Sequence, residues 1–88
     1  MDRLSAIEAF VAVADLASFS RAAERLKIAK SVVSRQVSAL EAELGARLFH
    51  RTTRSLTLTE VGRSYLERTR QILADLRSEE HTSELQSH

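Results

Sequence analysis

The segment from residue 30 to residue 44 constrains the fold most, because its apolar and polar residues repeat at the period of a helix. Val33, Val37, Leu40 and Leu44 fall on one stripe at 3.6 residues per turn. Serines dominate the opposite side, although a face selected only for helix stability would carry Glu, Lys, Gln or Ala. The pattern therefore predicts a helix whose polar face serves something other than helix stability.

The composition favours helices in the rest of the chain as well. Its 88 residues suffice for one small domain, and with no Pro and only two Gly a turn-rich sandwich or barrel is disfavoured. There is no Cys for a disulfide or a thiolate metal site, and no apolar signal segment follows Met1. The longest purely apolar run, residues 9–14, is far short of the roughly 20 residues of a membrane span. We expect a mainly α, cytoplasmic domain without a cofactor and without contact to a membrane.

Helix boundaries follow from the spacing of apolar residues and from capping residues. A first helix is expected over residues 2–15, with Asp2 as its N-cap, and a short second helix begins after Ser18, which can cap it. The helix over residues 30–44 should stop at Gly45, because glycine readily adopts the left-handed conformation found beyond a helix C-terminus.

Two further elements are expected after Gly45. Leu48 and Phe49, then Leu56 and Leu58, flank a polar, arginine-bearing tip, which predicts a small β-hairpin. Thr59 can cap a fourth helix. Along that helix a stripe at steps near 3.5 predicts a dimerisation face, formed by Val61, Tyr65, Thr69, Ile72 and Leu76.

The second and third helices have the spacing of a helix-turn-helix. Ala23 is small enough for a close approach of the two helices, Lys27 lies in the turn four residues later, and Val33 can fill the space between them. Lys27 departs from the usual pattern, since Gly or Asn adopts a left-handed turn more readily. Residues 27–29 are therefore expected to form a tight turn.

Charge is distributed unevenly along the chain. The formal net charge is +1, but residues 21–54 contain eight basic and three acidic residues, a net charge of +5. A polyanion responds to this local charge, because salt screens interactions beyond roughly 8 Å. The middle of the chain is thus the part suited to bind a nucleic acid.

The chain resembles the N-terminal winged helix-turn-helix domain of the LysR family of bacterial transcriptional regulators. The resemblance covers about residues 2–76 and rests on LSAIEAFVAVADLASFSRAAERL, SVVSRQVSALEAELGARLFHRTTRSLTLTEVG and RSYLERTRQIL. It implies a cytoplasmic protein that binds double-stranded operator DNA as a homodimer, or as a higher oligomer of the full-length protein. It also implies a linker helix that pairs two winged domains, and a small-molecule effector bound by a second domain outside this chain.

The serine-rich face suits the major groove of DNA. Short hydroxyl side chains let a helix backbone come close to base edges and phosphates, and an arginine can contact a phosphate or guanine. Lys30 can meet a base edge and Val32 a thymine methyl group. The predicted recognition helix, residues 30–44, contacts DNA through Lys30, Ser31, Val32, Ser34, Arg35 and Ser38, with Arg35 foremost. Because Ala29 cannot cap this helix, Ser31 is also its candidate cap.

Further DNA contacts are predicted from the hairpin and from the second helix. By similarity to the family, the hairpin is the wing, residues 50–55, lying at the adjacent minor groove, where A/T-rich DNA attracts arginine. Its candidate residues are Arg51, Thr52, Thr53 and Arg54. Phosphate contacts near the start of the second helix are assigned to Ser18, Ser20 and Arg21.

The residues offer little for catalysis or metal binding. His50, His81 and His88 lack metal-ligand spacing, and Glu41 and Glu43, two residues apart on a helix, cannot share a proton. No phosphate-binding glycine loop or nucleophile motif is present, so we expect no enzyme. The alternative function is a small helical protein-interaction module that dimerises through residues 59–76 without nucleic acid.

The last twelve residues differ from the preceding ones. RSEEHTSELQSH has one apolar residue, Leu85, and resembles the translation of a common sequencing-library adapter. We expect a DNA-binding domain over residues 1–58, a truncated linker helix over residues 59–76 and a non-native tail over residues 77–88. Resequencing the locus should then show different codons after Leu76.

Overall fold

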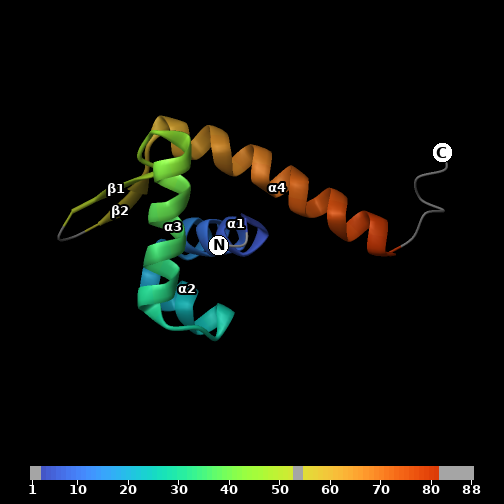
Figure 1. Cartoon of the computed structure of the whole chain (residues 1–88), viewed down its shortest axis with the longest axis horizontal. Coiled ribbons are helices and arrows are strands. Elements are labelled where there is room, and N and C mark those ends of the chain that lie inside the picture. Colours follow the sequence, from blue (N-terminus) through green and yellow to red (C-terminus); the bar gives the residue numbers. More distant parts are fainter. Residues whose placement is uncertain (1–2, 53–54, 82–88) are drawn as a thin grey trace.

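Four helices and one β-hairpin form the described part of the chain, which comprises residues 3–52 and 55–81 of the computed structural model, with side chains described to residue 76 (Figure 1). The mainly helical winged helix-turn-helix that the sequence predicts is confirmed. In chain order the elements are α1 (Arg3–Leu16), α2 (Phe19–Leu26), α3 (Lys30–Leu44), β1 (Phe49–Arg51), β2 (Leu56–Leu58) and α4 (Glu60–His81).

Helix α1 lies at the centre of the core and packs against α2, α3 and α4. Its Phe10 is fully buried, and the ring centroid lies 5.4 Å from those of Phe49 and Tyr65. Val33 and Val37 of α3 are also fully buried. Aromatic pairs at this separation add to the stability gained by burying apolar surface. The core thus joins the helices, the hairpin and the first half of α4.

The helix-turn-helix forms as its spacing predicts. Ser18 caps α2, its Oγ accepting from the Arg21 N–H at 3.1 Å, and Lys27 adopts a left-handed conformation with φ 60°. The Ile28 N–H donates to the Ala23 carbonyl at 3.1 Å, which closes the turn. The prediction that Ser31 caps α3 is wrong, because Ala29 occupies the cap position and makes no side-chain cap hydrogen bond, while Ser31 lies inside the helix.

The hairpin is antiparallel, pairing Phe49 with Leu58, and Thr59 joins it to α4. As predicted, Thr59 caps α4, its Oγ1 accepting from the Gly62 N–H at 2.9 Å. The same hydroxyl donates to the Arg47 carbonyl at 2.6 Å. A Cβ added at Gly62 would lie 2.1 Å from the Leu48 carbonyl oxygen, so the chain requires glycine there.

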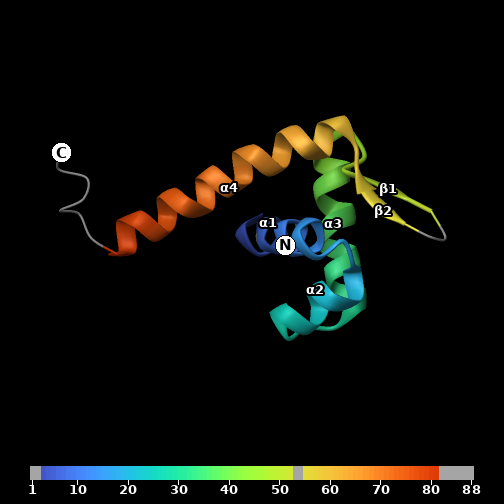
Figure 2. The ribbon, with the colours of Figure 1, turned by 180° about the vertical axis from the view of Figure 1, so that it is seen from behind.

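Helix α4 extends beyond the other helices on the side away from the hairpin (Figure 2). Arg70 forms an ion pair with Asp15, which anchors α4 to the C-terminal end of α1. The helix continues to His81, past the expected end at Leu76, because residues 77–81 include no Gly or Pro and loss of an apolar stripe does not end a helix. Helix α1 ends at Leu16, one residue past its predicted end, and the predicted cap Asp2 lies outside the described residues.

Candidate nucleic-acid interface

Helix α3 presents a polar face to solvent and an apolar face to the core. Val33 and Val37 are fully buried and Leu40 is 1% exposed, whereas Arg35 and Ser38 are exposed. Lys30 and Ser31 are also exposed, and Val32 and Ser34 are partly buried. Among the described residues Arg35 forms no ion pair. The split between the two faces agrees with the period of the sequence.

Leu44 departs from the predicted apolar stripe, since it is 41% exposed. At this end α3 passes beyond the core and reaches the first turns of α4. There Leu44, Val61 and Tyr65 line a shallow hollow of about 230 Å³. The last turn of α3 therefore contributes to a surface next to α4 and not to the core.

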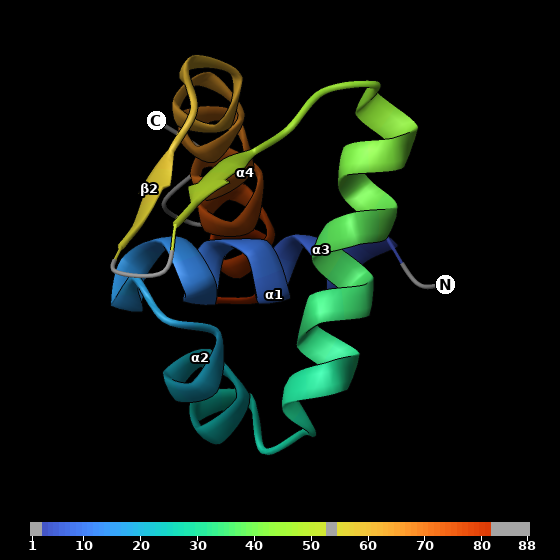
Figure 3. The same ribbon diagram turned by 90° about the vertical axis from the view of Figure 1, so that its left-hand side faces the viewer.

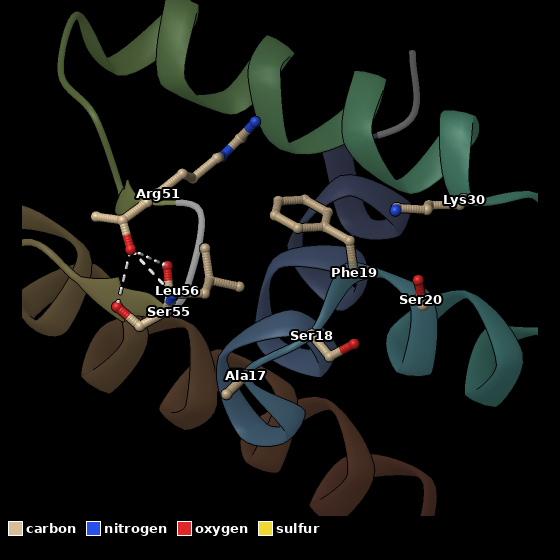
Figure 4. Close-up of a pocket in the computed structure, with 9 residues that line it drawn as sticks. Ala17, Ser18, Phe19, Ser20, Lys30, Arg51, Ser55 and Leu56 are labelled. Carbon is tan, nitrogen blue, oxygen red and sulfur yellow. Dashed lines mark hydrogen bonds between the residues drawn. The ribbon is translucent and has the colours of Figure 1, made fainter.

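Helix α3 and the hairpin lie on the same side of the molecule, in front of α1 and α4 in Figure 3. A hollow of about 420 Å³ separates the start of α2 from the hairpin. It gathers predicted DNA contacts from three elements, and Figure 4 shows four of them: Ser18, Ser20, Lys30 and Arg51. Thr52 also lines the hollow. Arg21 is exposed beside this region but does not line the hollow.

The tip of the hairpin is closed by Thr52 and Ser55. The Thr52 N–H donates to the Ser55 carbonyl at 2.9 Å, and the Ser55 N–H donates to Thr52 Oγ1 at 2.9 Å. The Thr52 hydroxyl therefore already serves the turn. The predicted wing residues Thr53 and Arg54 lie outside the described residues.

Arg51 lies at the edge of the hollow, where its partly exposed side chain contacts residues of α2 and α3. Its guanidinium carbon lies 4.6 Å from the centre of the Phe19 ring, and its Nη2 lies 3.8 Å from Glu41 Oε1. Glu41 is nearly buried, and its Oε2 accepts from the Leu48 N–H at 2.8 Å and faces Arg47 Nε at 3.4 Å. Sequence reasoning missed Glu41, although its place four residues after Val37 puts a carboxylate next to the buried stripe.

The predicted dimerisation stripe of α4 divides into two sets. Tyr65 packs on Phe10, and burial raises the pKa of its phenol, opposed by the nearby Arg3. Thr69 is fully buried, and its hydroxyl donates to the Leu66 carbonyl at 3.1 Å. The second set is exposed: Val61 by 45%, Ile72 by 47% and Leu76 by 42% of the residue surface. Of the predicted stripe, these three residues therefore expose the most surface to another molecule.

Among the side chains described within residues 3–52 and 55–76, no group of three could hold a metal ion. Within residues 3–52 and 55–81, none of the helices combines the length and apolar character of a membrane span. His50 is exposed on β1, as a surface residue of the hairpin should be.

The helix-turn-helix, the hairpin beside it and the long fourth helix define a winged helix-turn-helix protein. The sequence profile described as "Bacterial regulatory helix-turn-helix protein, lysR family" matches residues 4–63. The chain therefore belongs to the LysR family. Membership in a family of regulatory proteins agrees with the expectation that the chain is not an enzyme.

Relatives and solved structures of this family resemble the chain closely. It is 46% identical over 76 residues to the HTH-type transcriptional regulator YhjC of Escherichia coli (strain K12), an overlap of 86% of this chain and 25% of YhjC. It is 51% identical over 71 residues to the HTH-type transcriptional regulator CrgA of Neisseria meningitidis serogroup C (strain 8013), an overlap of 81% of this chain and 24% of CrgA. The chain thus spans about a quarter of the length of each regulator.

Two of the similar structures are complexes with DNA. The CbnR DNA-binding domain in its DNA complex matches with a TM-score of 0.85 at 33% identity, covering 100% of both chains. The BenM DNA-binding domain in complex with catB site 1 DNA matches with a TM-score of 0.83 at 35% identity, covering 89% of this chain and 86% of the BenM chain.

Proposed function

We propose that this chain is the sequence-specific DNA-binding part of a bacterial transcriptional regulator. The observation that carries the proposal is the exposed serine and arginine face of α3, seated on buried Val33 and Val37. The likeness to the CbnR and BenM DNA-binding domains, both in complex with DNA, supports it. Helix α3 enters the major groove of duplex DNA, and the wing lies at the adjacent minor groove.

The side chains of α3 divide the work of recognition. Arg35, exposed and unpaired within the described chain, binds a guanine edge or a phosphate. Lys30 and Val32 near the helix start contact base edges, and the short hydroxyl groups let the backbone approach the groove. The serines of this set are Ser31, Ser34 and Ser38.

Phosphate contacts flank the recognition helix. The N-terminal end of α2 contacts the phosphate backbone of one DNA strand, because the helix dipole favours negative charge there. The contacts are made by Ser18, Ser20 and Arg21. On the wing, the residues proposed to contact DNA at the minor groove are Thr52, Thr53 and Arg54. Arg51 differs from these residues, because its guanidinium is already engaged by Phe19 and Glu41.

Helix α4 pairs with the same helix of a second copy, so that two winged domains meet a two-fold operator. The exposed Val61, Ile72 and Leu76 form the contact, and Tyr65 and Thr69 support it from the core side. In this proposal residues 1–58 bind DNA, residues 59–76 link the dimer and residues 77–88 contribute nothing to function. The protein works in the cytoplasm, and effector sensing belongs to another part of the regulator.

Selection of duplexes from a randomised pool, followed by salt titration, tests the DNA proposal. Arg35→Ala should weaken binding by about 1–3 kcal/mol, and the loss of a phosphate contact would also lower the salt slope by about one. Arg25→Ala is the matched control, because it removes the same charge from an arginine that faces Asp15. A protein-interaction module would show no steep salt dependence, and equal binding by the two variants would contradict the assignment of Arg35.

Sedimentation of two charged variants tests the dimer. Ile72→Glu should shift the chain toward monomer, because it places a charge in an apolar contact. Gln71→Glu adds the same charge at a neighbouring exposed position of α4 and should leave the association unchanged. If both variants associate like the parent chain, α4 is not the dimer interface.

A further inference from the structure

Arg51 is held by two elements that lie far apart in the sequence. Its guanidinium lies over the ring of Phe19 at the start of α2, 4.6 Å from the ring centre, and its Nη2 is 3.8 Å from Glu41 Oε1 on α3. Figure 4 shows the side chain extending from the hairpin toward Phe19, with Lys30 approaching from the other side. The contacts therefore tie β1 to both helices of the helix-turn-helix.

Glu41 supplies the fixed end of this connection. Its side chain is 10% exposed, and its Oε2 accepts a hydrogen bond from the Leu48 N–H, immediately before β1. Removing a carboxylate from water is costly unless cations and donors surround it, and here Arg47, Arg51 and the N–H of Leu48 do so. Glu41 thus fixes both the entry of the chain into β1 and the side chain at the end of β1.

We propose that Arg51 is a positioning residue: with Glu41 and Phe19 it forms a latch that holds the wing at a fixed angle to α3, and it does not itself contact DNA. The inference rests on the proposed DNA-binding function and revises the expectation that Arg51 is a groove contact. DNA binding depends on this angle because α3 and the wing must reach adjacent grooves together. Without the latch, the wing would be ordered only when DNA binds, and the entropy lost in this ordering would weaken binding.

The sign of one substitution distinguishes a latch from a direct contact. Glu41→Gln retains an acceptor for the Leu48 N–H but removes the charge that holds Arg51. The latch predicts that the full chain binds its selected duplex roughly threefold to tenfold more weakly. If Arg51 contacted DNA, Glu41→Gln would release it and remove an anion near the duplex, so binding would strengthen. Stronger or unchanged binding overturns the proposal.

Arg47 offers a matched control, because it also pairs with Glu41 but its side chain is 65% exposed and lies before the hairpin strands. In a double-mutant cycle, Glu41→Gln with Arg51→Gln should weaken DNA binding no more than the stronger single variant. Glu41→Gln with Arg47→Gln should give nearly additive effects. Additive effects for the Arg51 cycle would overturn the latch.

Arg51→Lys is the second variant, should Glu41→Gln fail to fold. Lysine keeps the charge that a phosphate contact needs, but loses the planar group that lies on Phe19 and reaches Glu41. The latch predicts that Arg51→Lys also binds roughly threefold to tenfold more weakly, with an unchanged salt slope. Binding equal to that of the parent chain overturns it.

A measurement on the free protein separates this inference from the proposed function. The Phe19 ring should shift the NMR signal of the Arg51 Hε proton upfield, and Glu41→Gln should move that signal back toward its value in an unfolded peptide. An Arg51 signal that is unshifted, or unaffected by Glu41→Gln, overturns the latch whether or not the chain binds DNA. Failure of the parent chain to bind any duplex would instead refute the proposed function alone.

Discussion

Helix α3 and the wing present their side chains by different means. The exposed face of α3 follows from its own sequence, because burying Val33 and Val37 turns Arg35 and Ser38 outward. The wing has only two strands of three residues each, and such hairpins are marginal in isolation. Its position depends on Glu41 and on α2 and α4. The recognition residues of a helix can thus be predicted from its own sequence, whereas the position of the wing depends on contacts with other elements.

Two arginines illustrate this difference. Arg35 is exposed and forms no ion pair in the described residues, so it is available to a ligand. Arg51 has the same chemistry and a similarly basic neighbourhood, but its guanidinium contacts Phe19 and Glu41. Residue type and local charge therefore identify a basic region without showing which of its cations are available.

A substitution at Gly62 would disrupt the packing of α4 against the hairpin. Gly62→Ala would place a Cβ 2.1 Å from the Leu48 carbonyl oxygen, and backbone atoms must move to admit it. We expect a loss of about 3 kcal/mol in the free energy of unfolding, measured in urea. Gly45→Ala is the control: its Cβ meets nothing within 4 Å, and only the left-handed φ of 68° costs about 1 kcal/mol. Equal losses would show that the wing junction is not tightly packed.

Substitutions at two adjacent residues of α3 test its buried face and its exposed face separately. Val37→Ala removes fully buried carbons and should reduce the free energy of unfolding by about 2 kcal/mol. Ser38→Ala, on the exposed face, should change stability by less than about 0.5 kcal/mol while weakening DNA binding. Urea unfolding and DNA titration of both variants test the pair. A large stability loss in Ser38→Ala would contradict the division of the two faces.

A substitution at the N-cap of α2, next to the hairpin, should have a smaller effect on stability. Ser18→Ala removes the acceptor of the Arg21 N–H and should reduce the free energy of unfolding by about 1 kcal/mol. Ser20→Ala is the control, because Ser20 lies inside the helix and is exposed. Thermal unfolding of both variants decides whether Ser18 is a cap as well as a proposed phosphate contact. Equal melting temperatures would show that the cap contributes nothing.

Local chemistry was enough to predict most of the fold. The period of α3, the caps at Ser18 and Thr59 and the stop at Gly45 depend on residues a few positions apart. The end of α4 was predicted less well, because the change of composition after Leu76 does not interrupt the helix. A helix continues wherever its residues tolerate the conformation, whether or not one face is buried.

The site was only partly predictable, because some of its features depend on tertiary contacts. Glu41 and Arg51 are ten positions apart, and only the path of the chain after Gly45 brings them together. The period of α4 likewise placed Thr69 on a stripe without showing that this residue faces the core of its own chain. Periodicity assigns a residue to a face, but the neighbouring elements determine what that face meets.

The turn between α2 and α3 allows a change in the opposite direction. Lys27 adopts φ 60°, a left-handed conformation that strains residues with a Cβ, although glycine also loses more conformational freedom on folding. The balance predicts that Lys27→Gly stabilises the chain by about 0.5 kcal/mol, the smallest effect considered. Lys27→Ala retains the Cβ and should give no such gain, which separates strain from the loss of charge. If urea unfolding shows equal stability for the two variants, the left-handed conformation at position 27 does not strain the chain.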